Sequence, residues 1–233
     1  GSLPFQKMFW FTGSSGRNGK GTCIRIIESL VGQTFTVSDI EPRDLREKFY
    51  KSRLIGKRLA TTGDLHNRLA NVASLKQLTG GDRQMADIKF GDPKSFVNNA
   101  KFIFAMNKLP ELPPNESIKP IAKRIVILPY EYEIKNPNSA VEQEFLKELP
   151  GIFNKAVDGL KRLQNNREFT KVDRGEKLLT LYMDKKSLFE SFCEEKLDYD
   201  LSKEGTFLNI LWLNFQKWME EIYGGDTWRT DRQ

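Results

Sequence analysis

The sequence predicts an α/β fold: a P-loop core with a central, mostly parallel sheet, followed by a helical C-terminal region. Three observations support this prediction. Short apolar runs, each suited to a buried strand, recur between residues 8 and 128. A glycine-rich loop separates the first run from an amphipathic helix, which is the context of a phosphate-binding loop. After Glu131 the apolar spacing becomes helical.

Composition sets the class of protein without deciding its function. The chain has 233 residues, enough for one large domain or a domain with a small appendage, and 39% are hydrophobic. A net charge of +6 is compatible with a polyanionic partner. Cys23 and Cys193 lie far apart and predict neither a disulfide framework nor a zinc site. No signal peptide or membrane-length apolar run is visible, so we expect a cytoplasmic protein of the host cell.

The first motif is a strand, a glycine-rich loop and a helix. Residues 8–11 predict the strand, TGSSGRNGKGT at 12–22 is the loop, and 23–30 predict a helix closed by Gly32. Glycines allow backbone N–H groups to turn toward phosphates, and Lys20 supplies the cation, so we predict ATP as the cofactor. The alternative is a glycine-rich turn with a surface lysine. The expected nucleotide-binding residues are Gly16, Arg17, Asn18, Gly19, Lys20, Gly21 and Thr22.

The loop departs from the usual spacing at two positions. Ser14 stands where the first glycine belongs, with Gly13 one step early. Gly21 stands where a Ser or Thr normally holds Mg²⁺, and the hydroxyl arrives one residue late, at Thr22. More of the metal binding therefore falls on an acid elsewhere.

Asp64 is the candidate acid. Residues 39–50 predict a loop and a short charged helix, and residues 57–64 predict a second strand that ends in Asp64, as a Walker B acid should. We expect Asp64, with Thr22, to bind Mg²⁺ through water. The alternative is a turn aspartate, and Asp82 is a weaker candidate for a second acid.

A predicted helix and hairpin follow. Residues 68–78 fit a helix ended by two glycines, and residues 87–97 predict a hairpin whose turn is Gly91-Asp92-Pro93-Lys94. Lys89 and Lys94 of the hairpin could bind DNA phosphates. From these residues alone, solvated charge is the preferred interpretation.

Two further strands carry polar residues at their ends. Residues 101–107 predict a third strand whose tip, Asn107, could orient an attacking water, or could be an ordinary turn residue. Residues 125–128 predict a fourth strand after Arg124. Arg124 is a candidate arginine finger, and its alternative is a surface ion pair.

The remaining sequence predicts helices. Residues 142–149 and 150–163 fit two helices, with Pro150 in a first turn. A polar stretch at 164–176 could be a linker, and further helices are expected near 188–197 and 208–222, the last stopped by Gly224-Gly225. We expect a motor core at 1–134, a helical extension at 135–175 and a small helical end at 176–233. Gly1-Ser2 looks like a cloning scar, so a cut from a longer protein is expected.

Together these segments resemble the superfamily 3 helicases, specifically the AAA+-like primase–helicase group of phages, plasmids and poxviruses. The order and spacing agree over about residues 8–163, and KQLTGGD at 76–82 is the most specific signal. A P-loop lysine followed by Gly-Thr is familiar in this group. The other matching segments are residues 16–22, 56–64, 102–107, 123–129 and 148–160.

The resemblance implies a replicative DNA helicase: a hexameric ring on one strand of single-stranded or forked DNA, unwinding 3′ to 5′, with a primase upstream and a virus or plasmid as its source. It implies that Lys20 and Thr22 contact phosphate and metal, that Asp64 is the Walker B acid, and that Asn107 is the sensor. It also implies that Arg124 reaches the neighbour's ATP, and that Lys89 and Lys94 lie in the central channel.

Some residues depart from that family. Asp64 stands where Glu is common, residues 84–87 replace an Ile-Thr-Ala-Arg segment, and Lys123 replaces an arginine. The residues after about 176 match that family weakly. A truncated, winged-helix-like DNA-binding unit is one possible interpretation of this segment. Three alternative functions also stay open: a ring translocase or remodeller, a nucleotide-binding assembly or DNA-binding module with little ATP turnover, and, less favoured, a small-molecule kinase.

Overall fold

The computed structural model describes residues 5–14, 16–112, 118–138, 140–184, 192–193, 195–197 and 208–223. Its centre is a five-stranded sheet with the strand order β2-β3-β6-β1-β7, and each neighbouring pair is parallel. This confirms the predicted α/β class with a central parallel sheet. The strands are β1 (Met8–Thr12), β2 (Thr36–Val37), β3 (Leu59–Thr62), β6 (Lys101–Met106) and β7 (Ile125–Pro129).

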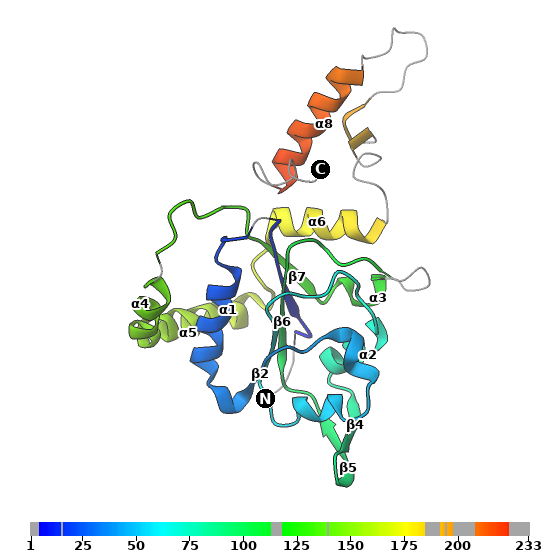
Figure 1. The fold of residues 1–233 in the computed structure, drawn as a ribbon, viewed down its shortest axis with the longest axis vertical. Helices are drawn as coiled ribbons and strands as arrows, with labels where there is room; N and C mark the ends of the chain where they lie inside the picture. Colours follow the sequence, from blue (N-terminus) through cyan, green and yellow to red (C-terminus); the bar gives the residue numbers. More distant parts are fainter. Residues whose placement is uncertain are drawn as a thin grey trace.

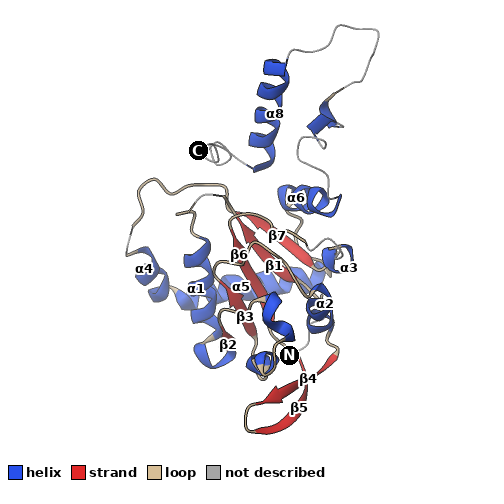
Figure 2. Ribbon diagram, turned by 45° about the vertical axis from the view of Figure 1, so that its right-hand side comes forward, coloured by secondary structure: helices blue, strands red, loops and turns tan. Residues whose placement is uncertain are grey.

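Helices cover both faces of the sheet, as a parallel sheet requires (Figures 1 and 2). On one face α1 (Lys20–Val31) packs over Phe11 and Ile103, and on the other Trp10 and Phe102 belong to the larger core cluster. Because successive strand residues point to opposite faces, the continuous apolar runs supply both cores. The larger core also contains residues of α2 (Val72–Gly80) and α3 (Lys119–Ala122).

The segment between α1 and β3 contains more structure than the sequence predicted. The short strand β2 pairs with β3 and was not expected, because two residues are too few for a recognisable pattern. Tertiary pairing therefore decides this strand. Three short 3₁₀-helices also occur in this segment: η1 (Gln33–Phe35), η2 (Pro42–Arg46) and η3 (Tyr50–Leu54).

A two-stranded hairpin leaves the body of the molecule at the end of the sheet opposite α6 (Figure 1). Its strands are β4 (Arg83–Ile88) and β5 (Gly91–Val97). Ile88 pairs with Gly91, so the turn consists of Lys89 and Phe90. The hairpin itself was predicted, but the prediction that its turn lies at residues 91–94 is wrong.

Pro93 is the reason for this difference. The Gly-Asp-Pro-Lys sequence has the chemistry of a turn, yet in the structure Pro93 lies within β5. The ladder is irregular between Ala86 and Ile88 on the opposite strand, where a missing N–H costs little. Lys94 pairs with Ala86 and is therefore a strand residue, whereas Lys89 is at the tip.

Helices dominate the chain after the sheet. These are α4 (Val141–Lys147), α5 (Leu149–Asn166), α6 (Asp173–Asp184) and α8 (Leu208–Tyr223). The first two match the predicted helices, and Pro150 lies in the first turn of α5. The helix α6 was not predicted, because its first turn lies in the polar stretch that suggested a linker.

The helix α6 packs on the edge strand β7, and the approach is close. A Cβ atom on Gly175 would lie 2.1 Å from the Ile127 carbonyl oxygen, so only glycine fits there. The expected division after residue 175 falls inside this helix. In the described part of 176–233, all regular structure is helical. Predictions that concern Gly1, Ser2, Leu188, Phe189 and Gly224-Gly225 lie outside the described residues.

Candidate nucleotide site

The candidate site lies at the carboxyl edge of the sheet. Because β3, β6 and β1 are neighbours and parallel, the segments that follow them meet at one edge. These segments carry Asp64, Asn107 and the glycine-rich loop. In Figure 1 this edge faces α6, and the β4–β5 hairpin lies at the opposite end.

Lys20 is the centre of the site. Its Nζ donates hydrogen bonds to the Gly13 carbonyl oxygen at 2.7 Å, to Asn18 Oδ1 at 3.1 Å and to Asn107 Oδ1 at 3.3 Å. The side chain is 7% exposed. Burial lowers the Lys20 pKa below its ordinary value, and the negative charge of Asp64 raises it in part. The structure thus brings together Lys20, Asp64 and Asn107.

Gly13 shows why the first glycine of the loop comes one step early. A Cβ atom at this position would lie 2.2 Å from the Tyr130 carbonyl oxygen and 2.5 Å from Asn18 Nδ2. The Tyr130 N–H also donates to the Thr12 carbonyl at 2.6 Å. The end of β1 is therefore hydrogen-bonded to Tyr130, the residue that follows β7. No side chain larger than that of glycine fits at residue 13.

Asn18 bridges the loop. Its Nδ2 donates to the Tyr130 carbonyl at 3.1 Å, and its Oδ1 accepts from Lys20. Arg17 has a positive φ of 56°, and its carbonyl accepts from Ile134 N–H at 3.0 Å. These contacts hold the loop against the chain that follows β7.

The loop runs directly into α1. Gly19 precedes the helix in the left-handed conformation, with φ of 85°, which glycine adopts at little cost. A Cβ atom on Gly16 would meet nothing within 4 Å, and one on Gly21 would meet Arg25 Nη1 at 3.2 Å. The Thr22 hydroxyl accepts a long hydrogen bond of 3.4 Å from Arg25 Nη2. The first turn of α1 therefore presents N–H groups and one hydroxyl at the end of β1.

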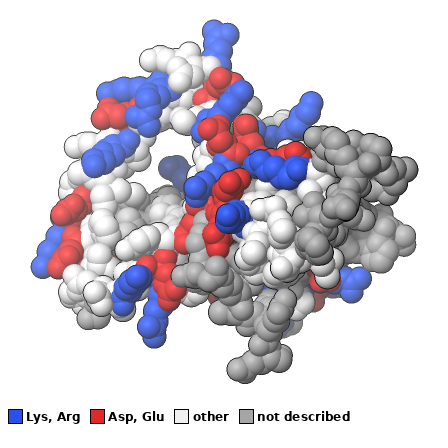
Figure 3. All heavy atoms as spheres, turned by 90° about the horizontal axis from the view of Figure 1, so that it is seen from above, with Lys and Arg blue, Asp and Glu red and all other residues white. Residues whose placement is uncertain are grey.

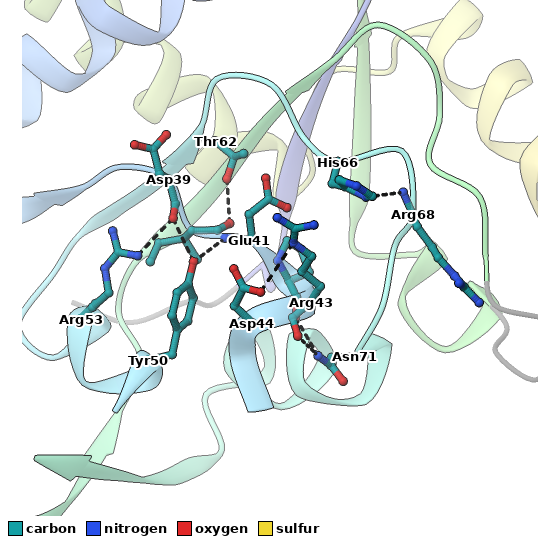
Figure 4. A network of polar contacts seen from close by, with 12 residues as sticks. Asp39, Glu41, Arg43, Asp44, Tyr50, Arg53, Thr62, His66, Arg68 and Asn71 are labelled. Carbon is teal, nitrogen blue, oxygen red and sulfur yellow. Dashed lines mark hydrogen bonds and ion pairs between the residues drawn. The ribbon is translucent and has the colours of Figure 1, made fainter. Parts of the chain in front are cut away.

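The end of β3, which leads to Asp64, is supported by the loop after β2 (Figure 4). Ile40 N–H donates to the Thr61 carbonyl at 3.1 Å, and Thr62 Oγ1 donates to the Ile40 carbonyl at 2.7 Å. After Asp64, Leu65 N–H donates to the Ala105 carbonyl of β6 at 2.7 Å. Asp64 therefore lies between two backbone contacts that fix its position relative to Asn107.

The same loop carries a second acid, Glu41, which the sequence did not mark. Burial raises the Glu41 pKa above its ordinary value, while a hydrogen bond from the His66 backbone and the positive charge of Arg43 lower it in part. Tyr50 holds this loop: its hydroxyl accepts from Glu41 N–H and donates to the Asp39 carbonyl, both at 2.9 Å (Figure 4). No sequence pattern indicates Glu41, because its burial depends on the fold.

Arg124 and Asp82 lie away from this site. Arg124 immediately precedes β7, so it lies at the amino edge, and its Nη1 donates to the Lys76 carbonyl and to Thr79 Oγ1 at the end of α2. Asp82 follows α2 and lies near the same end, since its Oδ2 would be 3.7 Å from a Cβ atom on Gly80. Within one molecule neither side chain joins Lys20.

Surface charge and possible metal ligands add little to this site. Viewed from above, basic and acidic side chains are intermixed, so this face has no single basic patch among its described residues (Figure 3). In the described part of the chain, no group of three His, Cys, Asp or Glu side chains is arranged to hold a metal ion.

None of the described helices is long and apolar enough to cross a bilayer.

The backbone partners of the loop could not be predicted from the sequence. The carbonyls of Gly13 and Tyr130 carry contacts that any residue could make, so only the requirement for glycine at residue 13 gave a signal. Asn18 was predicted from its place in the loop, but its bridging contact was not.

Comparison with known proteins supports the fold. Residues 11–124, from β1 to the start of β7, match a family described as a family of unknown function (DUF5906). A search of curated proteins gave no match. Among solved structures, the apo C-terminal region of NrS-1 (305–718) matches with a TM-score of 0.54 and 14% identity, over 94% of this chain and 61% of that chain.

Two other structures match less well. A second structure of the NrS-1 C-terminal region gives a TM-score of 0.49 at 16% identity, over 64% of this chain and 35% of that one. A JCV helicase bound to a small molecule gives 0.41 at 14% identity, over 76% and 56%. These two TM-scores are too low to support an argument. The chain spans less than two thirds of each solved chain, and the similarity to NrS-1 concerns the fold alone.

Proposed function

We propose that this chain is the motor part of an ATP-dependent DNA helicase of the superfamily 3 type, a hexameric ring on single-stranded DNA joined to an upstream primase. The observation that carries the proposal is Lys20. It is buried at the carboxyl edge, with its Nζ against Asn107 and within the field of Asp64. A P-loop lysine, an acid and a polar strand tip are the groups that ATP hydrolysis needs.

The binding of ATP would replace the present partners of Lys20. Its Nζ now bonds to oxygens of Gly13, Asn18 and Asn107. A phosphate oxygen offers the same ammonium a charged acceptor, and charge-assisted hydrogen bonds are roughly twice as strong as neutral ones. The exchange keeps Lys20 satisfied in both states, and Asn107 would become free to orient a water molecule.

The residues present fit Mg²⁺. This ion commonly takes one or two protein groups, with phosphates and water completing its shell, so a protein-only cluster is not required. Thr22 and Asp64 are the oxygen donors that would hold it, Asp64 through water. When bound, Mg²⁺ would neutralise charge on the β- and γ-phosphates.

Arg124 enters the proposal as a finger for a neighbouring subunit. It lies at the edge of the sheet opposite its own P-loop, and its hydrogen bonds to the Lys76 carbonyl and to Thr79 both come from Nη1. A guanidinium has five N–H groups, so these two contacts leave capacity for a phosphate of another molecule. Hydrolysis would then need assembly, and an isolated subunit would be a poor ATPase.

The test is ATP turnover with and without single-stranded DNA, over a range of protein concentrations. Wild type should show DNA-stimulated turnover that rises steeply with concentration, because the finger acts between subunits. Lys20→Ala should abolish turnover, whereas Lys155→Ala, a control at an exposed position on α5, should not. Full turnover in strictly monomeric protein would contradict the ring.

A second pair of variants tests the acid. Asp64→Asn should lower turnover by about 10²–10³-fold, the usual cost of removing one electrostatic group from an active site. Asp82→Asn is the matched control, since this acid lies at the end of α2. Equal losses in the two variants would remove Asp64 from the mechanism.

The same measurements test the alternative of a nucleotide-binding module. Gly21 in place of the metal-binding hydroxyl favours this alternative. It predicts ATP binding that Lys20→Ala destroys, together with no turnover at any protein concentration or in the presence of DNA.

A further inference from the structure

The carboxyl group of Glu41 is hydrogen-bonded to the turn that carries Asp64. It accepts from the backbone N–H of His66, two residues after Asp64. In Figure 4 the Glu41 side chain extends from its loop between Thr62 and His66. A half-buried carboxyl group is costly without a hydrogen-bond partner, and the His66 N–H supplies one. Glu41 therefore connects the loop after β2 to the turn after β3.

The backbone on either side of Glu41 is held independently of this contact. The Glu41 N–H donates to the Tyr50 hydroxyl, and that hydroxyl donates to the Asp39 carbonyl, both at 2.9 Å. The Arg53 guanidinium donates to the carbonyls of Ser38 and Asp39, at 2.7 and 3.2 Å. The carboxyl group of Glu41 thus extends from a fixed segment of chain, as a residue that positions another should.

The turn that carries Asp64 is tied to the chain on both sides of β3. The Leu65 N–H donates to the Ala105 carbonyl of β6 at 2.7 Å, and the His66 N–H donates to Glu41 in the loop after β2. The strands β2 and β6 flank β3 in the sheet. Asp64 itself is exposed, so burial does not fix its side chain. The direction in which its carboxylate leaves the sheet therefore depends on these contacts.

We propose that Glu41 is a positioning residue for Asp64: its carboxyl group holds the His66 N–H and thereby keeps Asp64 directed toward the Mg²⁺ of bound ATP. This inference rests on the proposed function and adds to that site a residue from outside its motifs. Asp64 keeps the metal-binding role, and Glu41 acts through the turn. Removal of an outer partner of this kind typically costs about 10- to 100-fold in metal affinity or activity.

The first measurement follows the hydrogen bond itself, without nucleotide. The chain has a single histidine, so isotopic labelling of histidine gives one backbone amide resonance, that of His66. Glu41→Ala should speed hydrogen exchange at this amide by about tenfold or more, the usual worth of a hydrogen bond to a charged group. Glu41→Gln keeps an acceptor oxygen and should keep most of the protection. Asp44→Asn is the matched control, because this nearby acid pairs with Arg43 at 3.5 Å, and it should exchange as wild type does.

The second measurement asks whether that hydrogen bond serves the metal. The affinity for a fluorescent ATP analogue is measured with Mg²⁺ and with EDTA, and the ratio of the two affinities isolates the contribution of the metal. Glu41→Ala should lower this ratio by about 10- to 100-fold, and Glu41→Gln much less. General damage to the fold would lower both affinities alike. In an Asp64→Asn background, Glu41→Ala should lower the ratio no further, because both changes act through one carboxylate.

The inference is overturned if Glu41→Ala leaves His66 exchange unchanged, leaves the affinity ratio unchanged, or lowers the ratio as much again in the Asp64→Asn background. Wild-type ATP turnover, measured on the same samples, separates the two proposals. Absent turnover, together with an affinity ratio that Glu41→Ala lowers, would defeat the helicase and support the positioning role. Normal turnover with an unchanged ratio would defeat only the role of Glu41.

Discussion

The two ends of the molecule place a lysine in opposite environments, one buried and one exposed. At the carboxyl edge, Lys20 is 7% exposed and is held by three oxygens of its own chain. At the hairpin tip, Lys89 lies in solvent beside a ring that is 97% exposed. The first arrangement fixes an ammonium before a ligand arrives, as chemistry requires. The second leaves the ammonium group and the ring in solvent.

The largest expected effect comes from Arg124, which lies at the hairpin end of one subunit and would reach the ATP site of its neighbour. Arg124→Ala should lower ATP turnover by about 10³-fold or more, as the loss of an arginine finger does. Lys123→Ala, its exposed neighbour, is the control. Mixing Arg124→Ala subunits with Lys20→Ala subunits should restore part of the activity, because each supplies what the other lacks. A mixture as inactive as its components would place Arg124 in a structural role.

Arg124 also holds the end of α2, so its stability needs a separate measurement. Arg124→Lys keeps a cation at this position but loses the planar guanidinium. Its melting temperature should lie close to that of wild type while its turnover stays low. If turnover follows melting temperature across both variants, the effect of Arg124 is on folding.

A smaller effect, about 10²-fold on nucleotide affinity, is expected from Gly13→Ala. The new methyl group would collide with the Tyr130 carbonyl, which is backbone and cannot turn aside, and small displacements of a binding group are costly. Gly151→Ala, on α5 and outside the loop, meets nothing within 4 Å and should bind a fluorescent ATP analogue normally. Equal affinities for the two variants would show that Gly13 does not shape the site.

The smallest expected effect is the uptake of a proton by Lys20 when ATP binds. The pKa of Lys20 is lowered, mainly by burial, and phosphates would raise it again. At pH values between the lowered pKa of free Lys20 and its higher pKa in the ATP complex, binding takes up a proton, so the affinity for ATP falls as pH rises through this interval. Calorimetry in alkaline buffers of different ionisation enthalpy should detect this uptake. Lys20→Met should abolish it, and an unchanged proton uptake would assign it to another group.

The sequence predicted the strand, loop and helix at the carboxyl edge of the sheet better than it predicted the hairpin. Glycines and a lysine between an apolar run and a helix are seldom found outside phosphate-binding loops, so β1, the loop and α1 were predicted with nearly their observed bounds. The hairpin turn was misplaced, because Pro93 is tolerated in a strand only where the ladder is irregular, and that depends on pairing. The helix α6 was missed because its first residues are polar, and contact with β7 decides it.

Arg124 also forms the hydrogen bonds that hold the end of α2, the helix that leads into the hairpin. Its guanidinium holds the Lys76 carbonyl and the Thr79 hydroxyl in the last turns of α2, and β4 begins three residues after that helix ends. In the proposed ring, a guanidinium that turned toward a neighbour's phosphate would release this fastening. The nucleotide state of one subunit would thereby act as a latch on the hairpin of the next, through a single side chain.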